Sequence, residues 1–575
     1  MRALFLFFTD PPRAFSSSVA ALAAVVRSAG HEPLALEVHR KQKIADVAAR
    51  VDALAPDLLG VATMTRDWAG ARALLERLSC DPYVVVGGYH ASLAPRDVAA
   101  CERVDAIAIG EGERPLKTLL DQLASDRPKT SYPGMWVRNY SKARDWSDPL
   151  PPADPEPDIV ALPPWDYDVF GDMRSILGHG VNTFGPHVDR YLPTRAGRGC
   201  PFTCAYCSAP RWGKLQNFAA RDKRNTRPVA HLCDELASLR DRYEPEGFEF
   251  WDEHFPISVE WLRELAREYP RRVGIPFKVE MHPSAASRER LELLVEAGCI
   301  LFHCGVESGD EAFRHDVLNR RTPDARLQQL FDDCRALGLA TSASLMTMLP
   351  GETRAQTRST TDLLHRLQPG SFMWSTYHPL PGTVLGDAAV AEWPGPARER
   401  FDDYDDVVTR TPPQVSAAER ADTFRELADL QSSLVQIASR KRAEQTRARP
   451  VEIPVAKRVA PLELARLLGL APAGARLDGP RINTASFEHG ELTVEIEHPQ
   501  FSPHEVRIAP REGSRHFVEA GCVGLSYRGQ SAPQLLLRIL RAMAERLGDT
   551  DIEALRAALE PERASEGDVG VGAMK

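Results

Sequence analysis

Residues 198–207 read Arg-Gly-Cys-Pro-Phe-Thr-Cys-Ala-Tyr-Cys and bring Cys200, Cys204 and Cys207 into one short stretch. The stretch follows a predicted strand over 191–197 and precedes a helical pattern. Thiolates gathered this tightly select either zinc or an iron–sulfur cluster. Three protein ligands around a four-iron cluster leave one iron open, so that a substrate can bind it directly. The spacing therefore predicts a catalytic iron–sulfur cluster in a loop.

Structural zinc is the alternative, and it requires a fourth ligand close to the three cysteines. The nearest candidates, His231 and Cys233, lie on the helix predicted to follow the loop, where they fit the helix surface and the core. No other ligand stands near in the sequence. The donor set therefore favours the cluster over zinc.

The cysteine loop opens a series of six strand–helix units within residues 191–400. Short apolar runs alternate with amphipathic helical patterns, which is typical of parallel strands joined by crossover helices. Six such units predict a partial (β/α)6 barrel, smaller than the usual eight. Active residues in such a barrel belong at the carboxyl ends of the strands.

Residues 1–127 form an earlier alternating series, which predicts an α/β domain with a doubly wound parallel sheet. Ligands of such sheets bind at the carboxyl ends of the strands. Gly87–Gly88 and Gly110–Glu113 both follow predicted strands. Glycine at these ends permits close approach of a ligand to the backbone, although a plain turn would explain it as well.

The remaining segments are read from composition. Residues 128–190 are rich in proline and polar groups, which predicts an ordered linker across the surface. Residues 401–575 predict a small α+β domain of unknown role, with a long charged helix over 416–447, antiparallel strands within 480–545 and a helix over 534–547. We expect the tail after residue 560 to be disordered.

Composition excludes several classes of protein. A chain of 575 residues with 43% hydrophobic and 26% charged residues is typical of globular domains. The net charge of −9 argues against nucleic acid as a partner, and no apolar stretch is long enough to span a membrane. The opening residues 1–8 lack the features of a signal peptide, so we expect a cytoplasmic protein with reduced cysteines. The scattered cysteines then fit as small buried residues: Cys80, Cys101, Cys233, Cys299, Cys304, Cys334 and Cys522.

The cysteine loop resembles the signature C-x3-C-x-aromatic-C of the radical S-adenosylmethionine superfamily. Cys200, Cys204, Tyr206 and Cys207 match it position by position. The resemblance implies a 4Fe–4S cluster on the three cysteines, with the open iron chelated by S-adenosylmethionine. It also places Tyr206 beside the cluster and the adenine.

The resemblance extends along the barrel and implies roles for several carboxylates. Asp252, or next to it Glu253, would contact the methionine ammonium, for which a carboxylate is the natural partner. Glu280 would hold the ribose hydroxyls, and Glu307 would face the cofactor. A surface or helix-capping carboxylate is the alternative for each.

Three further segments of the barrel match the superfamily. Residues 319–322 (NRRT) resemble the segment that gives a basic residue to the methionine carboxylate, and the sequence leaves Arg320 and Arg321 equally open. Residues 349–353 (LPGET) and 379–383 (PLPGT) resemble the loops after the fifth and sixth strands.

The N-terminal series is similar to the cobalamin-binding domain that precedes the barrel in many of these enzymes. The resemblance lies in 84–95 (VVVGGYHASLAP) and 106–116 (AIAIGEGERPL). It implies cobalamin as a cofactor, whose nucleotide tail would be bordered by Thr63, Thr65, Gly87, Gly88 and Glu111. The loop 9–13 lacks the axial histidine of free-standing domains. His90, just after the glycine pair, is read as a solvated or capping residue.

Together these resemblances imply reductive cleavage of S-adenosylmethionine to a 5′-deoxyadenosyl radical and cobalamin-dependent C-methylation of an unactivated carbon in a biosynthetic pathway. The substrate would be a small molecule or peptide, and an external donor such as flavodoxin or ferredoxin would supply electrons. Radical cyclisation or ring rearrangement, as in a tetrapyrrole cyclase, is the first alternative. A non-catalytic iron–sulfur or cobalamin sensor is the second.

Overall fold

The computed structural model divides into two compact units, Met1–Ser439 and Arg440–Lys575. Within the first unit it describes residues 1–433 apart from 10–14, 40–41, 126–129, 140–144, 147–148, 155–158, 179–180, 183–187, 217–224, 391–415, 417, 420 and 432. Within the second unit it describes five strands between residues 481 and 528.

The N-terminal part of the first unit is a seven-stranded sheet in the order β2-β1-β3-β4-β5-β6-β7. The first five strands of the chain pair in parallel, as the alternating pattern predicts. The strands are β1 (Arg2–Thr9), β2 (Glu32–His39), β3 (Leu58–Ala62), β4 (Tyr83–Gly87), β5 (Ala106–Ala108), β6 (Met135–Asn139) and β7 (Asp145–Trp146). The helices are α1 (Ser17–Ser28), α2 (Ile44–Leu54), α3 (Trp68–Leu75), α4 (Tyr89–Leu93), α5 (Pro95–Ala99) and α6 (Glu113–Leu123). The order reverses between β1 and β3, and such a switch point forms a ligand crevice.

The segment 128–190 differs from the predicted surface linker. Its strand β6 pairs antiparallel with β5 and extends the first sheet, followed by β7. Met135, Trp136 and Val137 of β6 are buried in the core. This apolar run is short and stands among proline and polar residues, so the composition of the whole segment did not indicate a strand. The segment goes on through η1 (Tyr167–Phe170), α7 (Met173–Gly178), β8 (Val181–Asn182) and β9 (Val188–Asp189).

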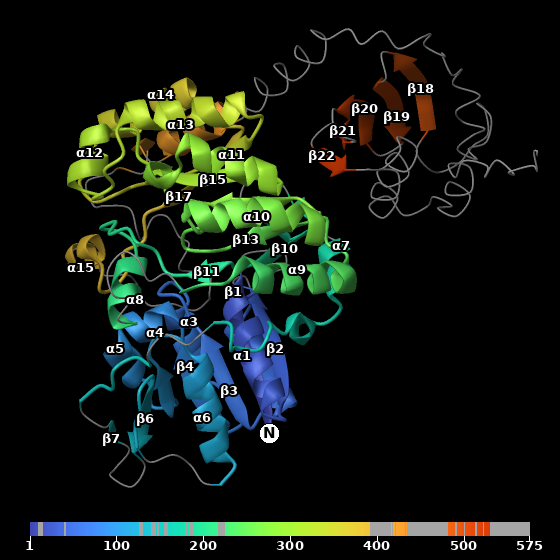
Figure 1. The fold of residues 1–575 in the computed structure, drawn as a ribbon. Coiled ribbons are helices and arrows are strands. Elements are labelled where there is room, and N and C mark those ends of the chain that lie inside the picture. The colour runs from blue at the N-terminus through green and yellow to red at the C-terminus, as the bar shows by residue number, and fades with distance from the viewer. Residues whose placement is uncertain are drawn as a thin grey trace, which may run out of the picture. The chain divides into compact units, whose positions relative to one another are not determined.

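The second sheet is the predicted partial barrel. Its six strands all pair in parallel, in the chain order β10-β13-β14-β15-β16-β17. The strands are β10 (Tyr191–Thr194), β13 (Gly247–Phe250), β14 (Phe277–Glu280), β15 (Cys299–Glu307), β16 (Ala340–Thr347) and β17 (Ser371–Thr376). The helices among and after them are α8 (Ala209–Leu215), α9 (Val229–Tyr243), α10 (Val259–Arg272), η2 (Pro283–Ala285), α11 (Arg288–Ala297), α12 (Glu311–Asp316), α13 (Asp324–Ala336), α14 (Arg354–Leu367) and α15 (Val384–Val390). A short antiparallel pair, β11 (Gly197–Arg198) and β12 (Asn225–Thr226), follows β10. Figure 1 shows the barrel helices outside this sheet and the first sheet on the side of α8.

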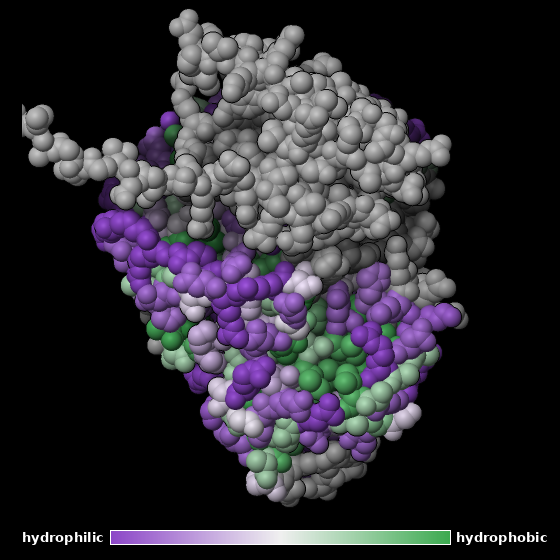
Figure 2. Space-filling model, turned by 90° about the vertical axis from the view of Figure 1, so that its right-hand side faces the viewer, coloured by the Kyte–Doolittle hydropathy of each residue, from purple (hydrophilic) through white to green (hydrophobic). Residues whose placement is uncertain are grey.

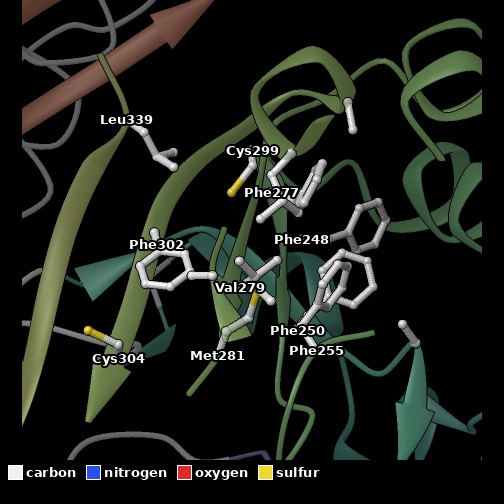
Figure 3. Close-up of a cluster of buried hydrophobic side chains, with 14 of the residues drawn as sticks. Phe248, Phe250, Phe255, Phe277, Val279, Met281, Cys299, Phe302, Cys304 and Leu339 are labelled. Carbon is white, nitrogen blue, oxygen red and sulfur yellow. The ribbon is translucent and has the colours of Figure 1, made fainter. Parts of the chain in front are cut away.

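Alternate residues of the barrel strands build the core between sheet and helices. Phe248 and Phe250 of β13 pack with Phe277 of β14, and Phe302 of β15 lies in the same cluster (Figure 3). The residues between them, such as Glu249 and Lys278, are on the opposite face, since side chains alternate along a strand. This alternation frees the inner face of the barrel for polar groups.

The scattered cysteines behave as small core residues. Cys101, Cys233, Cys299, Cys304 and Cys334 are buried and Cys80 is half-buried, all as free thiols. Their burial confirms the prediction that these cysteines are small buried residues. Cys522 lies outside the described residues.

The predicted boundary at residue 400 also differs from the structure. Helical residues 421–431 belong to the first unit, where Leu427 and Leu430 join the barrel core. Thr423 accepts a hydrogen bond from Arg354 of α14 at 2.6 Å, and Gln431 donates one to the carbonyl of Phe372 in β17 at 2.7 Å. The boundaries predicted at 127 and 190 stay predictions.

The second unit contains the antiparallel strands expected within 480–545. Five strands follow one another as a meander, each paired with the next. They are β18 (Arg481–Glu488), β19 (Glu491–His498), β20 (Phe501–Arg511), β21 (Arg515–Ala520) and β22 (Val523–Arg528). The helix predicted over 534–547 and the tail after 560 lie outside the described residues.

Hydrophilic residues predominate in the coloured part of the surface in Figure 2, and hydrophobic residues gather in its lower half, on the side of the first sheet. The large hydrophobic side chains exposed in the described part of the chain are Met64, Val160, Met373 and Val384. None of the described helices has the length and the apolar composition needed to cross a membrane.

The buried position of β6 gives a test of its place in the sheet. Trp136 is 1% exposed, so Trp136→Ala should lower the free energy of unfolding by about 3–5 kcal/mol, the usual cost of truncating a core tryptophan. Urea unfolding followed by circular dichroism measures this. Val160→Ala, at an exposed side chain of the same segment, is the control and should stay within about 0.5 kcal/mol of wild type. Equal stability of the Trp136 variant would place this segment outside the fold core.

Candidate functional site

The three cysteines lie in the loop between β11 and α8, at the carboxyl end of the first barrel strand. Cys204 is 8% exposed, and Cys200 and Cys207 are half-buried. Burial, together with the neighbouring Cys204 and Cys200, raises the pKa of the Cys207 thiol to about 12. The Cys207 sulfur accepts a hydrogen bond from the N–H of Ala209 at 3.4 Å. The loop thus carries three thiols in one short segment, of which one is buried and two are half-buried.

Aromatic and backbone contacts hold this loop against the barrel. Phe202, between the first two cysteines, stacks on His282 at 3.8 Å between ring centroids and 11° between planes. Burial, helped by the charge of Arg320, lowers the pKa of His282 to about 2, so the imidazole is neutral. Ala205 donates its N–H to the carbonyl of Leu318 at 2.9 Å. Phe202 and His282 were not predicted as site residues, because neither belongs to a spacing pattern.

Arg320 rather than Arg321 faces the cysteines. Arg320 is 6% exposed, whereas Arg321 is on the surface. Its guanidinium donates to the Cys204 sulfur at 3.5 Å and to the Tyr206 hydroxyl at 3.2 Å. The same group donates to the carbonyl of Gly305 at the end of β15. The structure therefore separates two neighbours that the sequence left equal.

Glu307 completes this group at the end of β15. Its Oε1 accepts the hydroxyl proton of Tyr206 at 3.0 Å, and burial raises the pKa of its carboxyl. Its φ of 69° lies in the left-handed region, a strained conformation that is found most often at functional sites. A Cβ on Gly305 would lie 2.1 Å from Glu307 Oε1 and 2.9 Å from Arg320 Nη2. Glycine at 305 is what leaves room for both side chains beside the Tyr206 hydroxyl.

Glu280 ends β14 on the same inner face. Burial, and next the charge of Glu307, raise the pKa of its carboxyl to about 8. A carboxyl with this pKa is protonated at neutral pH, so it can donate as well as accept a hydrogen bond. That capacity suits a sugar hydroxyl. The predicted contact with ribose stays a prediction.

Asp252 and Glu253, after β13, bind the backbone that leads into the cysteine loop. Asp252 accepts the N–H groups of Ala196 at 3.0 Å and Gly197 at 2.7 Å, one on each oxygen. Glu253 accepts from the guanidinium of Arg195 at 2.9 Å and the N–H of Gly199 at 3.2 Å. Both carboxylates thus position the loop, and the predicted contact of Asp252 with a methionine ammonium stays a prediction.

A cavity opens at the carboxyl ends of the first sheet, beside the cysteine loop. Its floor is apolar and includes Phe5, Leu58, Val85, Leu116 and Met135. The predicted residues Gly87, Gly88 and Glu111 line its mouth, together with Glu113, Arg195, Arg198, Trp212 and Glu253. The cavity therefore joins the switch point of the first sheet to the start of the barrel.

Thr63 and Thr65 lie near this mouth but contact protein groups. The Thr63 hydroxyl donates to the carbonyl of Gly87 at 3.3 Å, and the Thr65 hydroxyl lies 3.4 Å from His90 Nδ1. His90 is 3% exposed, and its Nε2 pairs with Asp97 at 3.1 Å. The side chain is therefore buried, and the expectation that it is solvated was wrong. Trp68 stacks on its ring. These contacts keep His90 within the fold of the domain.

The residues present fit the two groups that the sequence implies. One buried and two half-buried thiols beside a buried arginine suit an anionic thiolate cluster, since the guanidinium offsets negative charge. An apolar floor suits the apolar part of a corrinoid tail. At the mouth, Glu113 Oε2 is buried without a partner among the described residues, so an amide N–H of such a ligand can satisfy it.

Five residues near the site were not predicted as site residues: Arg195, Arg198, Glu113, Tyr89 and Trp212. Their signals were present but weak, because Arg198 stands two residues before Cys200 and Glu113 belongs to the Gly110–Glu113 turn. Only the fold brings them together.

The raised pKa of Glu280 predicts how stability depends on pH. The folded state keeps this proton up to about pH 8, while the unfolded chain loses it near the ordinary value of 4.5. Its contribution to stability is therefore complete below about 4.5 and is lost as the pH rises toward 8. In Glu280→Gln the fall in thermal midpoint between pH 5 and 8 should be smaller than in wild type. Glu296→Gln, at an exposed residue of α11, should keep the wild-type slope, and equal slopes in all three proteins would contradict the assignment.

Comparison with known proteins gives two domain matches. Residues 194–364 match the radical SAM superfamily and residues 13–120 match the B12 binding domain. An uncharacterized methyltransferase of Pyrococcus horikoshii is 24% identical over 388 residues, which cover 67% of this chain and 79% of that protein. The anaerobic magnesium-protoporphyrin IX monomethyl ester cyclase of Rubrivivax gelatinosus is 23% identical and covers 59% of each chain.

Among solved structures, the radical S-adenosylmethionine methyltransferase TsrM of Kitasatospora setae shares the fold with a TM-score of 0.53 and 19% identity, over 68% of this chain and 76% of that chain. It has been solved with cobalamin and a 4Fe–4S cluster, and with tryptophan and an analogue of S-adenosylmethionine. The N-terminal match covers the sheet with the cavity, and the second match covers the cysteine loop and most of the barrel. This chain therefore contains a radical SAM domain and a B12-binding domain, and these domains imply a 4Fe–4S cluster, S-adenosylmethionine and cobalamin as its cofactors.

Proposed function

We propose that this enzyme transfers a methyl group to an unactivated carbon of a small-molecule or peptide substrate in a biosynthetic pathway. The observation that carries the proposal is the shared wall between the two sites. Arg198 and Trp212, on either side of the cysteines, line the same cavity as Gly87 and Gly88 of the B12-binding domain. A methyl carrier in that cavity would lie beside the place where the substrate radical forms. The methyltransferase names of the Pyrococcus and Kitasatospora proteins support the same outcome.

The residues of the barrel mouth would divide the work as follows. Cys200, Cys204 and Cys207 would hold the cluster, and Tyr206, Glu280, Glu307 and Arg320 would surround S-adenosylmethionine. When bound, the cluster supplies one-electron cleavage of S-adenosylmethionine, and cobalamin supplies methyl transfer.

The task of the chain's own residues is orientation and exclusion of water. Arg320 presents a permanent positive charge 3.5 Å from the Cys204 sulfur, and the carbonyl of Gly305 fixes its direction. The Tyr206 hydroxyl donates a hydrogen bond to Glu307, and this bond holds both side chains in place. A buried, preorganised set of this kind needs no reorganisation when a charged ligand arrives. An external one-electron donor, for example flavodoxin or ferredoxin, would complete the reaction in the cytoplasm.

Radical cyclisation or ring rearrangement is the second candidate function. The similarity to the magnesium-protoporphyrin ester cyclase favours it, since that protein matches over 59% of this chain. A non-catalytic sensor is the third outcome that an assay must separate.

The test is an anaerobic assay of the reconstituted protein with dithionite and S-adenosylmethionine labelled in its methyl group. We expect 5′-deoxyadenosine and, with substrate present, label in the product. Cys204→Ala should lose cluster absorbance and form no 5′-deoxyadenosine, because it removes a buried cluster ligand. Cys80→Ala, at a half-buried cysteine far from the loop in sequence, is the matched control and should keep both. Product without label would support cyclisation, and absence of 5′-deoxyadenosine would support the sensor.

Arg320 and Arg321 form a natural pair of neighbours for a binding test. Arg320→Lys removes the forked donor group and should weaken binding of S-adenosylmethionine about 10- to 100-fold, which corresponds to ~1.5–3 kcal/mol for hydrogen bonds to a charged group. Arg321→Lys leaves its surface charge in place and should bind as wild type does. Equilibrium dialysis of the cluster-loaded proteins measures both. Equal affinities of the two variants would show that Arg320 does not contact this ligand.

A further inference from the structure

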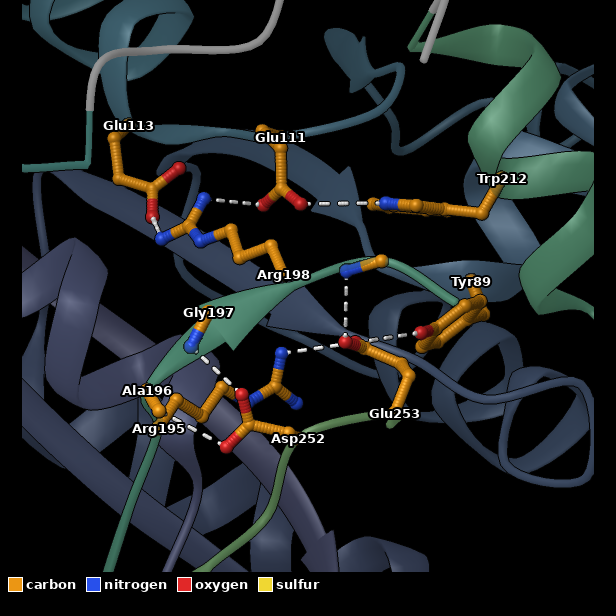
Figure 4. Close-up of polar contacts among 11 residues, drawn as sticks. Tyr89, Glu111, Glu113, Arg195, Ala196, Gly197, Arg198, Trp212, Asp252 and Glu253 are labelled. Atoms are coloured by element: carbon orange, nitrogen blue, oxygen red, sulfur yellow. Dashed lines mark hydrogen bonds and ion pairs between the residues drawn. The ribbon is translucent and has the colours of Figure 1, made fainter. Parts of the chain in front are cut away.

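One carboxylate of the B12-binding domain contacts both sides of the cysteine loop. Glu111 Oε2 accepts from Arg198 Nη1 at 2.8 Å, and Glu111 Oε1 accepts from Trp212 Nε1 at 3.3 Å (Figure 4). Arg198 stands just before Cys200, and Trp212 lies on α8, just after Cys207. The two contacts reach Glu111 from 87 and 101 residues away in the sequence.

Further contacts join the same turn to the same loop. Arg198 Nη2 binds Glu113 Oε1 at 2.5 Å, so the guanidinium spans both glutamates. With its side-chain amide oriented to satisfy both ends, Gln216 after α8 accepts from the N–H of Glu111 at 2.5 Å and donates to the carbonyl of Asp154 at 2.8 Å. Tyr89 of α4 packs on Trp212, with ring centroids 4.7 Å apart. The Gly110–Glu113 turn is thus connected to the loop before and after the cysteines.

This contact is buried and charged, which makes it rigid. The side chains of Arg198, Glu111 and Glu113 are 11%, 18% and 5% exposed. Burial raises the pKa of Glu111 against the opposing charge of Arg198, whereas Arg198 lowers the pKa of Glu113 in spite of burial. Removing one partner from such a pair leaves an uncompensated buried charge, which is strongly destabilising. These buried ion pairs therefore hold the Gly110–Glu113 turn and the cysteine loop together.

The atoms that make this contact are also the wall of the cavity. Glu111, Glu113, Arg198 and Trp212 all line it, beside Gly87 and Gly88. A ligand that fills the cavity presses against the residues that fix the cysteine loop. Likewise, a cluster that orders the loop fixes one wall of the cavity.

We propose that Glu111 is a positioning residue that couples the two cofactor sites, so that a corrinoid in the cavity and a cluster on the cysteines each strengthen the binding of the other. The proposal rests on the cofactors of the proposed function, but not on which reaction follows. Coupling between two sites is reciprocal and usually amounts to about 5- to 150-fold in affinity. We expect a ratio in this range between the dissociation constants of the cluster-free and the cluster-loaded protein.

The experiment measures hydroxocobalamin binding by anaerobic equilibrium dialysis, with the full chain in two states: reconstituted with its cluster and stripped of iron by chelation. In wild type the dissociation constant should be about 5- to 150-fold lower with the cluster present. In Glu111→Gln one carboxylate oxygen becomes an amide nitrogen, so the side chain can accept from Arg198 or from Trp212 but not from both. The negative charge is also gone, so the ratio should fall toward one. Trp212→Phe, which removes only the indole N–H donor, should give an intermediate ratio and serves if Glu111→Gln fails to fold.

Glu426→Gln is the matched control, since Glu426 also binds an arginine, Arg354, but on the outer side of the barrel helix α14. It should keep the wild-type ratio. A ratio of one in wild type would overturn the proposal. So would a Glu111 variant in which both affinities fall equally, because a merely structural role weakens both states without changing their ratio. No substrate or turnover enters the measurement, so a failure of methyl transfer would leave this result standing.

Discussion

The contact between two arginines and three glutamates at the junction of the two sheets governs the geometry of the site. Arg195 precedes β11 and Arg198 ends it. Arg195 contacts Glu253 from the barrel, and Arg198 contacts Glu111 and Glu113 from the first sheet. Charges in such a place lose their hydration, and only close, well-directed partners offset that loss. Each arginine has such a partner. The network fixes where β11 runs, and therefore where the loop with Cys200 begins.

The rest of the site follows from this fixed starting point. Asp252 binds two successive N–H groups of the strand that approaches the loop, and Phe202 stacks on His282 once the loop has turned inward. Arg320, in the segment after α12, contacts the Cys204 sulfur. Gly305 leaves the space in which Arg320 and Glu307 approach each other. The hydrogen bonds of Asp252 and Arg320, the stacking of Phe202 on His282 and the space left by Gly305 thus place the three thiols.

Local pattern predicted the elements well and their long-range partners poorly. The six barrel units and the five parallel strands came from periodicity, which each segment carries by itself. Strand β6 was missed because its five residues stand among prolines and polar groups, and its burial depends on pairing with β5. The helical residues 421–431 were assigned to a separate domain for a similar reason, since Leu427 and Leu430 become core residues only against the barrel.

By itself the sequence determined the cysteine loop, the order of the strand–helix units and the family to which they belong, because each depends on residues close together in the chain. The tertiary structure decided which charged side chains meet. Arg320 lies 116 residues from Cys204, and Arg198 lies 87 residues from Glu111, so no spacing rule connects them. It also turned Arg320 inward and Arg321 outward, a choice set by how the segment after α12 packs. Placing a buried charge requires its partner in space, and only the folded chain supplies that partner.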